Sequence, residues 1–241
     1  MSRSHLNLLA VLLCALSPAA QANLLTNGSF EVGPVPGTFV NLTGGSTAIT
    51  GWTVTGTTID YVGSLWEASD GSRSLDLDGS IGWPHTNGGV AQSFATMPGM
   101  AYVVSFDLAG NPYNTPTIKP MRVAAAGQSQ DFTFDSTGRS VVNMGWLAQS
   151  WSFTAVAAMT TLEFRSLTQA PQIGWGAALD NVSVSVVPEP AGWALMLAGM
   201  ALLGGLSRRS VRLAARAADD ATSLQRHGPT VSAARNPGAS S

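Results

Sequence analysis

Few residues of this 241-residue chain could support catalysis. Cys14 is the sole cysteine, and His85 is the sole histidine between residues 23 and 186, so that region cannot hold a thiolate or histidine metal cluster or use a cysteine nucleophile. Neither a Gly-x-Ser-x-Gly elbow nor a phosphate-binding loop occurs. Asp70, Asp76 and Asp78 cluster, and a glycosidase needs only two carboxylates, but Asp76 and Asp78 alternate with leucines, which is typical of a solvated strand face. The pattern therefore predicts that the protein is not an enzyme.

Aromatic residues in loop-like stretches predict sugar binding instead. A saccharide site needs exposed aromatic faces that stack on pyranose rings, together with polar groups that orient the hydroxyls. The candidate ligand-binding residues lie in segments rich in Gly, Pro and Asn, and they are Trp66, Trp83, His85, Asn87, Asn111, Tyr113 and Trp175. For each of them the alternative role is to fill a loop. Trp52, Trp146 and Trp151 lie in strand-like segments and are expected in the core.

One acidic residue is predicted to point into the domain. Asp180 shares its parity with Val182 and Val184 in an alternating segment, and a buried carboxylate must be paired or must bind a cation. Calcium takes about six to eight oxygen ligands, some of which turn carbonyls can supply. Backbone N–H groups at the rim of the domain could satisfy the same carboxylate, so both alternatives stay open.

The elements that must position these residues are short β-strands. From residue 23 to 186 the apolar residues alternate with period two, and turn residues interrupt the pattern about every 8–12 positions. The expected strands are 49–55, 57–62, 73–77, 90–94, 100–108, 121–125, 130–134, 150–155, 161–165 and 180–186. About ten short strands predict an all-β fold of two packed antiparallel sheets, a β-sandwich or jelly roll.

Both ends of the chain carry the features of targeting segments. Residues 1–22 fit a secretory signal peptide, with a cleavage site at Ala20-Gln21-Ala22. A second apolar segment, residues 191–206, has no charge and is followed by arginines. As a helix it would span about 24 Å, short of the ~30 Å hydrocarbon core of a bilayer. We expect a C-terminal hydrophobic helix in the membrane, with the main domain exported; a buried core helix is the alternative.

The same segment resembles a known sorting signal. Val187-Pro188-Glu189-Pro190, the apolar stretch and Arg208-Arg209 follow one another as in the PEP-CTERM signal of Gram-negative bacteria. The resemblance implies that residues 187–209 anchor the protein in the inner membrane. It also implies an exosortase, a membrane-embedded cysteine protease that removes the anchor and passes the protein to the cell surface or exopolysaccharide matrix. Residues 210–241 extend beyond the usual end of this signal, and their Ala-, Ser- and Arg-rich composition predicts a disordered tail.

A second resemblance covers nearly all of residues 23–186. Its motifs are Asn27-Gly28-Ser29-Phe30-Glu31, Gly51-Trp52-Thr53-Val54, Ser74-Leu75-Asp76-Leu77, Phe106-Asp107-Leu108-Ala109-Gly110-Asn111, Asn143-Met144-Gly145-Trp146 and Ala178-Leu179-Asp180-Asn181-Val182. In this order they resemble the bacterial choice-of-anchor C family, which is akin to a plant cell-wall family of unknown function and, more distantly, to galactose-binding-like carbohydrate modules. The resemblance implies a jelly-roll β-sandwich at the cell surface. It further implies a structural calcium site, since the residues corresponding to Glu31 and Asp180 lie side by side at such a site in related modules.

Charge restricts the partners. Residues 23–186 hold five basic against eleven acidic residues, a net charge of −6, and this acidic domain lacks the positive surface that nucleic acid requires. We therefore expect an exported surface or matrix protein whose domain binds extracellular polysaccharide. The alternative is a structural surface protein without a saccharide ligand.

Overall fold

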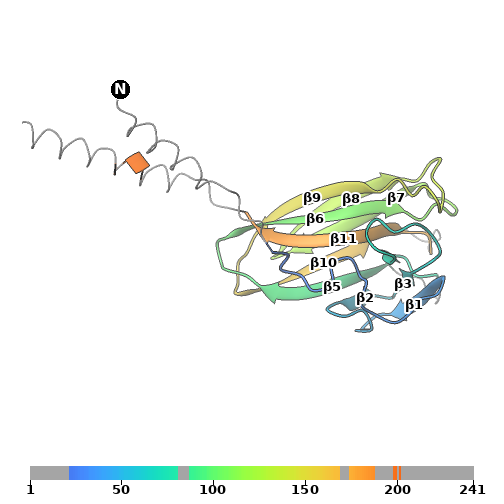
Figure 1. Cartoon of the computed structure of the whole chain (residues 1–241), viewed down its shortest axis with the longest axis horizontal. Coiled ribbons are helices and arrows are strands. Elements are labelled where there is room, and N and C mark those ends of the chain that lie inside the picture. The colour runs from blue at the N-terminus through green and yellow to red at the C-terminus, as the bar shows by residue number, and fades with distance from the viewer. Residues whose placement is uncertain (1–21, 81–86, 169–173, 188–197, 200, 202–241) are drawn as a thin grey trace, which may run out of the picture. The chain divides into compact units, whose positions relative to one another are not determined.

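The computed structural model describes residues 22–80, 87–168, 174–187, 198, 199 and 201 (Figure 1). Most of the predicted signal peptide, Pro188 to Pro190 and the tail lie outside these residues, as do the candidate ligand residues Trp83 and His85. The chain divides into two compact units, Met1–Val187 and Pro188–Ser241. Within the described ranges, no helix has both the length and the apolar character needed to cross a membrane.

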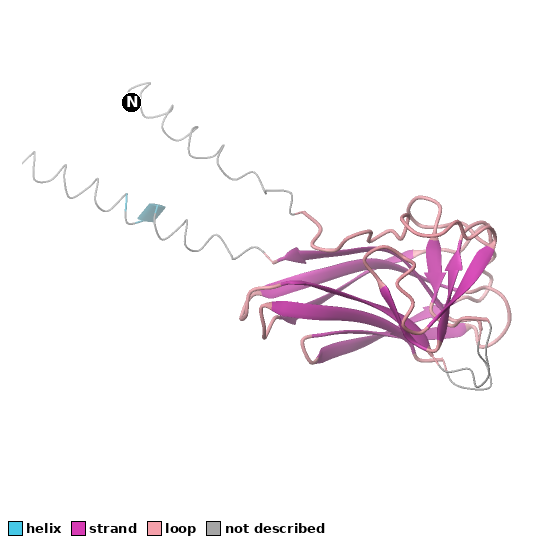
Figure 2. Cartoon of the chain, turned by 90° about the horizontal axis from the view of Figure 1, so that it is seen from below, coloured by secondary structure: helices cyan, strands magenta, loops and turns pink. Residues whose placement is uncertain are grey.

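Eleven β-strands of the first unit form two antiparallel sheets, confirming the predicted all-β fold (Figures 1 and 2). The six-stranded sheet has, in spatial order, β1 (Phe39–Thr43), β3 (Thr58–Val62), β4 (Ser74–Asp76), β11 (Ala177–Val186), β6 (Ala101–Gly110) and β9 (Leu147–Thr154). The five-stranded sheet has β2 (Thr53–Gly56), β5 (Gly88–Ala95), β10 (Met159–Ser166), β7 (Ile118–Ala125) and β8 (Gln128–Asp135).

The period-two pattern builds one core between the sheets. On β6 the buried side chains alternate with half-buried ones from Ala101 to Asp107. The Phe106 ring of this strand meets Phe164 and Phe132 of the other sheet edge-on, with centroids 5.1 and 5.2 Å away. Such pairs contribute about 0.5–1.5 kcal/mol beyond the burial of their surface. Trp52 and Trp151 lie in this core as predicted, while Trp146 is half-buried against it.

Two differences from the sequence prediction concern the six-stranded sheet. Strand β1 is not among the strands predicted from the sequence: it is a half-buried edge strand whose burial shows no alternation. The prediction of a solvated face for Asp76 and Asp78 was wrong. Strand β4 lies between β3 and β11, and Asp76 and Asp78 are 0% and 3% exposed. Asn111 and Gly176, which come from other parts of the chain, donate hydrogen bonds to the Asp76 carboxylate and enclose it.

Candidate functional site

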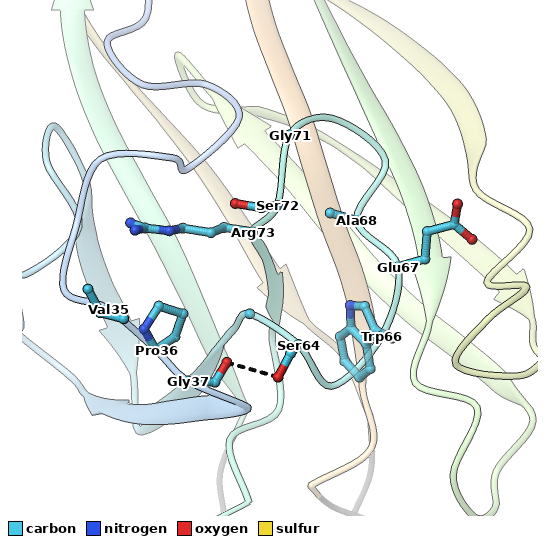
Figure 3. A pocket seen from close by; sticks show the side chains of 11 residues that line it. Val35, Pro36, Gly37, Ser64, Trp66, Glu67, Ala68, Gly71, Ser72 and Arg73 are labelled. Carbon is cyan, nitrogen blue, oxygen red and sulfur yellow. Dashed lines mark hydrogen bonds between the residues drawn. The ribbon is translucent and has the colours of Figure 1, made fainter.

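A cavity of about 570 Å³ lies beside the long loop, residues 63–73, that joins β3 to β4 (Figure 3). The opposite wall comes from the segment that precedes β1. The lining residues are Val35, Pro36, Gly37, Gly63, Ser64, Trp66, Glu67, Ala68, Gly71, Ser72 and Arg73. A guanidinium, two hydroxyls and an apolar wall therefore share one small space, which we call the loop pocket. The Glu67 carboxylate points away from these side chains (Figure 3).

Arg73 is the main charged donor of the loop pocket. Its Nη1 donates hydrogen bonds to the carbonyl oxygen of Gly33 (3.2 Å) and to the Tyr61 hydroxyl oxygen (2.8 Å), and the guanidinium lies 5.6 Å from the Tyr61 ring centroid. The Tyr61 hydroxyl donates in turn to the carbonyl oxygen of Phe30 (2.5 Å). Burial raises the pKa of Tyr61, although Arg73 acts in the opposite direction. Both of these Arg73 side-chain bonds come from Nη1, and the described residues provide no acceptor for Nε or Nη2.

Trp66 does not present the exposed ring that its loop position predicted. It is only 5% exposed, and its indole Nε1–H donates to the Ser74 hydroxyl (2.8 Å) at the start of β4. The loop folds back over the sheet and covers most of the ring, so Trp66 contributes only a small edge to the pocket wall. The exposed apolar surface comes instead from Val35, which is 86% exposed, and its neighbour Pro36.

Two carboxylates fix the conformation of the loop. Glu31 Oε1 accepts hydrogen bonds from the backbone N–H groups of Ser72 and Arg73, both at 2.8 Å. Asp180 Oδ2, on β11, accepts from the backbone N–H groups of Ser69 (2.8 Å) and Asp70 (2.9 Å). Gly71 between them has φ +66°, and a side chain there would strike the Glu31 carboxylate. The two acidic residues therefore hold the pocket wall from opposite ends.

These contacts bear on the predicted calcium site at Glu31 and Asp180. Asp180 is fully buried as predicted, but a register shift between Asp180 and Ser183 breaks its parity with Val182. Asp180 therefore lies on the same face as its partner Asp107, under the loop, and its second oxygen accepts the backbone N–H of Asn181 (2.6 Å). N–H donors carry partial positive charge and occupy the positions that a cation would need. Burial raises the pKa of Asp180 to about 7, against the effect of these three N–H groups. The residues therefore fit the hydrogen-bonding alternative and do not fit a shared calcium ion. No cluster of three potential metal-binding side chains exists in the described part of the chain.

Three other candidate ligand residues gather at the end of the sandwich where β6 finishes. Asn111 is buried, and its side-chain amide donates to Asp76 Oδ2 (2.7 Å). The carbonyl oxygen of half-buried Trp175 accepts a hydrogen bond from Nζ of the fully buried Lys119 (2.7 Å). Tyr113 is 48% exposed. The expectation of an accessible amide was thus wrong for Asn111, which serves the buried carboxylate.

Below these residues lies a buried charged cluster, Asp60, Asp76, Asp78 and Lys119. Burial raises the pKa of Asp76 to about 8, and the nearby charge of Asp78 acts in the same direction. Burial also raises the pKa of Asp78 and lowers that of Lys119. Asp76 accepts hydrogen bonds from three N–H donors, whereas Oδ2 of Asp78 is buried without a partner in the described structure. The cluster joins β3, β4 and β7 and is enclosed by protein.

Asn87 lies apart from the loop pocket, on the outer face of the five-stranded sheet. There two cavities of about 280 and 420 Å³ share Arg122 and Glu163. Arg122 makes a bidentate ion pair with Asp131, at 2.6 and 2.9 Å, and Glu163 accepts the Thr55 hydroxyl (2.7 Å). Among the residues that the structure describes, the lining of this sheet groove includes no aromatic side chain.

Sequence reasoning missed the residues that shape the loop pocket most directly, Arg73 and Val35. An isolated arginine next to a strand and a valine between prolines carry no pattern that would single them out. The better signal was Glu31 together with Asp180, which were singled out for calcium and which organise the pocket wall instead.

The fold and the loop pocket define a β-sandwich domain with a small polar site at its edge. The chain is similar in fold to TmCBM61 in complex with β-1,4-galactotriose, with 16% identity over 69% of this chain and 99% of that one and a TM-score of 0.42. It is also similar to the CBM22-1 xylan-binding domain of Paenibacillus barcinonensis Xyn10C, with 16% identity over 72% and 100% of the two chains and a TM-score of 0.41.

Sequence comparison places the domain in a family. The profile of the family described as "Protein of unknown function (DUF642)" matches residues 23–185, and the chain belongs to this family. Halomucin of Haloquadratum walsbyi (strain DSM 16790 / HBSQ001) is 32% identical over 178 residues. That match covers 71% of this chain but only 2% of halomucin. The expected kinship with a family of unknown function is confirmed, and the finer resemblances to choice-of-anchor C and PEP-CTERM proteins stay predictions.

Proposed function

We propose that the protein is an exported, non-catalytic module that binds polysaccharide through the loop pocket. The observation that carries this proposal is the half-buried Arg73 guanidinium, which is held in place by Gly33 and Tyr61 while two of its nitrogens have no acceptor in the described structure. A fixed guanidinium loses little conformational entropy when it binds sugar hydroxyls or a sugar carboxylate.

The rest of the pocket complements a saccharide. Its volume of about 570 Å³ falls within the ~300–1,000 Å³ typical of small-molecule sites. The Ser64 hydroxyl oxygen can accept a hydrogen bond, because its hydrogen is donated to the carbonyl oxygen of Gly37 (3.3 Å). Val35 with Pro36 offers an apolar surface for ring C–H groups. Since Glu31 and Asp180 hold the wall through backbone hydrogen bonds, the pocket is formed before the ligand arrives.

A glycan array of the domain spanning residues 23–187 tests this function. Binding by the wild type should be lost in Arg73→Ala and strongly weakened in Arg73→Lys, which keeps the charge but not the planar fork. Arg165→Ala in the sheet groove is the control and should bind normally, and melting curves should confirm that all variants fold.

The other outcomes point elsewhere. Loss of binding only in Arg165→Ala would move the site to the sheet groove. Absence of binding by the wild type, with or without calcium, would favour a structural surface protein without a saccharide ligand. Turnover of a polysaccharide would contradict the non-catalytic role.

For targeting, we propose export by the signal peptide and transient anchoring in the inner membrane, followed by exosortase cleavage near Pro188-Glu189-Pro190 and release to the surface or matrix. The sequence order of signal peptide, Pro-Glu-Pro, apolar segment and arginines supports this route. Intact-mass analysis of surface-extracted protein should show a species that lacks residues 1–22 and the apolar segment. A species that retains residues 191–241 would show an uncleaved anchor.

A further inference from the structure

Three large apolar side chains are exposed together at one end of the sandwich. Met97, Val156 and Met159 are 66%, 71% and 59% exposed. Met97 lies in the β5–β6 loop, Val156 lies in the β9–β10 loop, and Met159 is the first residue of β10. We call these three residues the apolar rim.

Hydrogen bonds hold the two loops of the rim together. The backbone N–H of Thr96 donates to the carbonyl oxygen of Ala158 (2.9 Å), and that of Gly99 donates to the carbonyl oxygen of Ala155 (2.8 Å). Met159 also lies opposite Ala95 in the β5–β10 ladder. The rim is therefore a surface of fixed shape and not a pair of independent loop tips.

The rim loops carry no charge. Residues 95–101 and 154–159 contain no Asp, Glu, Lys or Arg, although the domain as a whole is acidic. These two loops therefore carry no negative charge that a negatively charged surface would repel. The apolar side chains of the rim would also gain free energy by leaving water.

The chain leaves the domain beside the rim. The backbone N–H of Val187 donates to the carbonyl oxygen of Ala101 (2.9 Å), at the end of the β5–β6 loop. At the other end of the chain, the N–H of Leu24 donates to the carbonyl oxygen of Val184 on the same strand, β11. Figures 1 and 2 show β11 ending at the side of the sandwich where the β5–β6 and β9–β10 connections lie.

Covalent geometry limits the distance from this point to the apolar segment 191–206. Three residues, Pro188 to Pro190, separate Val187 from Ala191, so even a fully extended chain reaches at most about 14 Å between those two residues. The headgroup layer on each side of a bilayer is roughly 5–8 Å thick. If residues 191–206 enter a membrane, a domain tethered this closely keeps its exit end near the membrane surface.

We propose that the apolar rim lies in the interface of the membrane that holds residues 191–206, so that the domain rests on the lipid surface before it is released. The inference rests on the proposed membrane insertion of that segment. In this proposal the rim contacts the lipid headgroups and the upper acyl region, as amphipathic surfaces do at membrane interfaces.

Site-specific fluorescence tests this contact in the full-length chain. Cys14→Ser removes the sole thiol, and Met97→Cys or Val156→Cys then carries an environment-sensitive label. Ile118→Cys is the matched control, because Ile118 is 47% exposed and lies on β7 next to Asp135, away from the rim loops. The proteins are reconstituted in phosphatidylethanolamine–phosphatidylglycerol vesicles (3:1) with or without lipids that carry a shallow nitroxide quencher.

Labels at 97 and 156 should show blue-shifted emission and lose intensity with the quencher lipid, while the label at 118 should resemble the protein in buffer. If the protein floats with the vesicles but labels 97 and 156 behave like label 118, the rim does not touch lipid and the proposal fails while the anchor stands. A blue shift without lipid quenching would mean that protein covers the rim, either residues 191–206 or a second copy, which also overturns it. Failure to float would refute the anchor and the rim contact together.

Discussion

Replacement of Asp180 by alanine should loosen the loop pocket and destabilise the whole domain. The substitution removes the fully buried acceptor of three N–H groups, those of Ser69, Asp70 and Asn181. An unsatisfied buried donor costs about 1–3 kcal/mol; because these three residues are exposed and water can reach them, the lower end applies to each and the predicted loss is about 3 kcal/mol. At roughly 2–4 °C per kcal/mol for a domain of this size, Tm should fall by at least about 4 °C. Asp180→Asn keeps one acceptor oxygen and should cost less.

Thermal unfolding of the wild type and three variants measures this effect. Asp107→Ala is the control, because its carboxylate accepts Ser69 Oγ–H and Asn181 Nδ2–H at the surface, where water can replace it at a cost of about 1 kcal/mol or less. None of these proteins should respond to calcium or to a chelator. A calcium ion at a hundredfold excess over its Kd would add about 2.7 kcal/mol. A wild-type Tm raised by about 5–10 °C in calcium, with the rise absent in Asp180→Asn, would refute the hydrogen-bonding account and restore the metal site.

Other substitutions test the core and the buried charged cluster. Phe164→Ala should cost about 3–5 kcal/mol by urea unfolding, because it empties a fully buried ring site; a loss below about 1 kcal/mol would contradict the described packing. Burial raises the pKa of Asp76 from 3.8 to about 8, so the folded state binds the extra proton and the free energy of unfolding should fall as pH rises from about 4 to 8. Asp76→Asn should flatten that dependence, and an unchanged slope would contradict it. Lys119→Met removes the positive charge near Asp76 and Asp78. The free energy of unfolding should then fall more steeply between pH 5 and 8. A shallower slope would show that this charge does not stabilise the carboxylates.

Much of the fold could be predicted because the alternation of apolar residues is local information. Strand β6 illustrates this, since the alternation correctly placed Tyr102, Val104 and Phe106 in the core. In β11 a register shift after Asp180 puts its carboxylate on the opposite face from Val182. The same rule failed at Asp76, which also alternates with leucines. Whether the second face of a strand meets water depends on what covers it, and all three residues of β4 are buried. At Asp76 the covering groups are Asn111 and Gly176, which lie far away in the sequence.

The site was harder to predict because its residues come together only through tertiary contacts. Trp66 was chosen for its aromatic ring, yet the loop turns that ring inward onto Ser74. Asn111 was chosen as a sugar-binding amide, yet it is bonded to a carboxylate 35 positions away. Arg73 gained its role from Gly33 and Tyr61, which lie 40 and 12 positions away, and no spacing rule connects these three residues.

Strand β11 gives the domain a direct line for mechanical load. Its Asp180 holds the wall of the loop pocket, and the chain leaves the domain just beyond its last residue, Val186. Hydrogen-bonded ladders to β4 and β6 flank the strand, and these bonds run perpendicular to it. A pull on Val187 along β11 therefore loads many of these bonds at once in shear, rather than opening them one after another. Tension between a tethered chain end and a molecule held in the pocket would pass along this single strand in the geometry that best resists rupture.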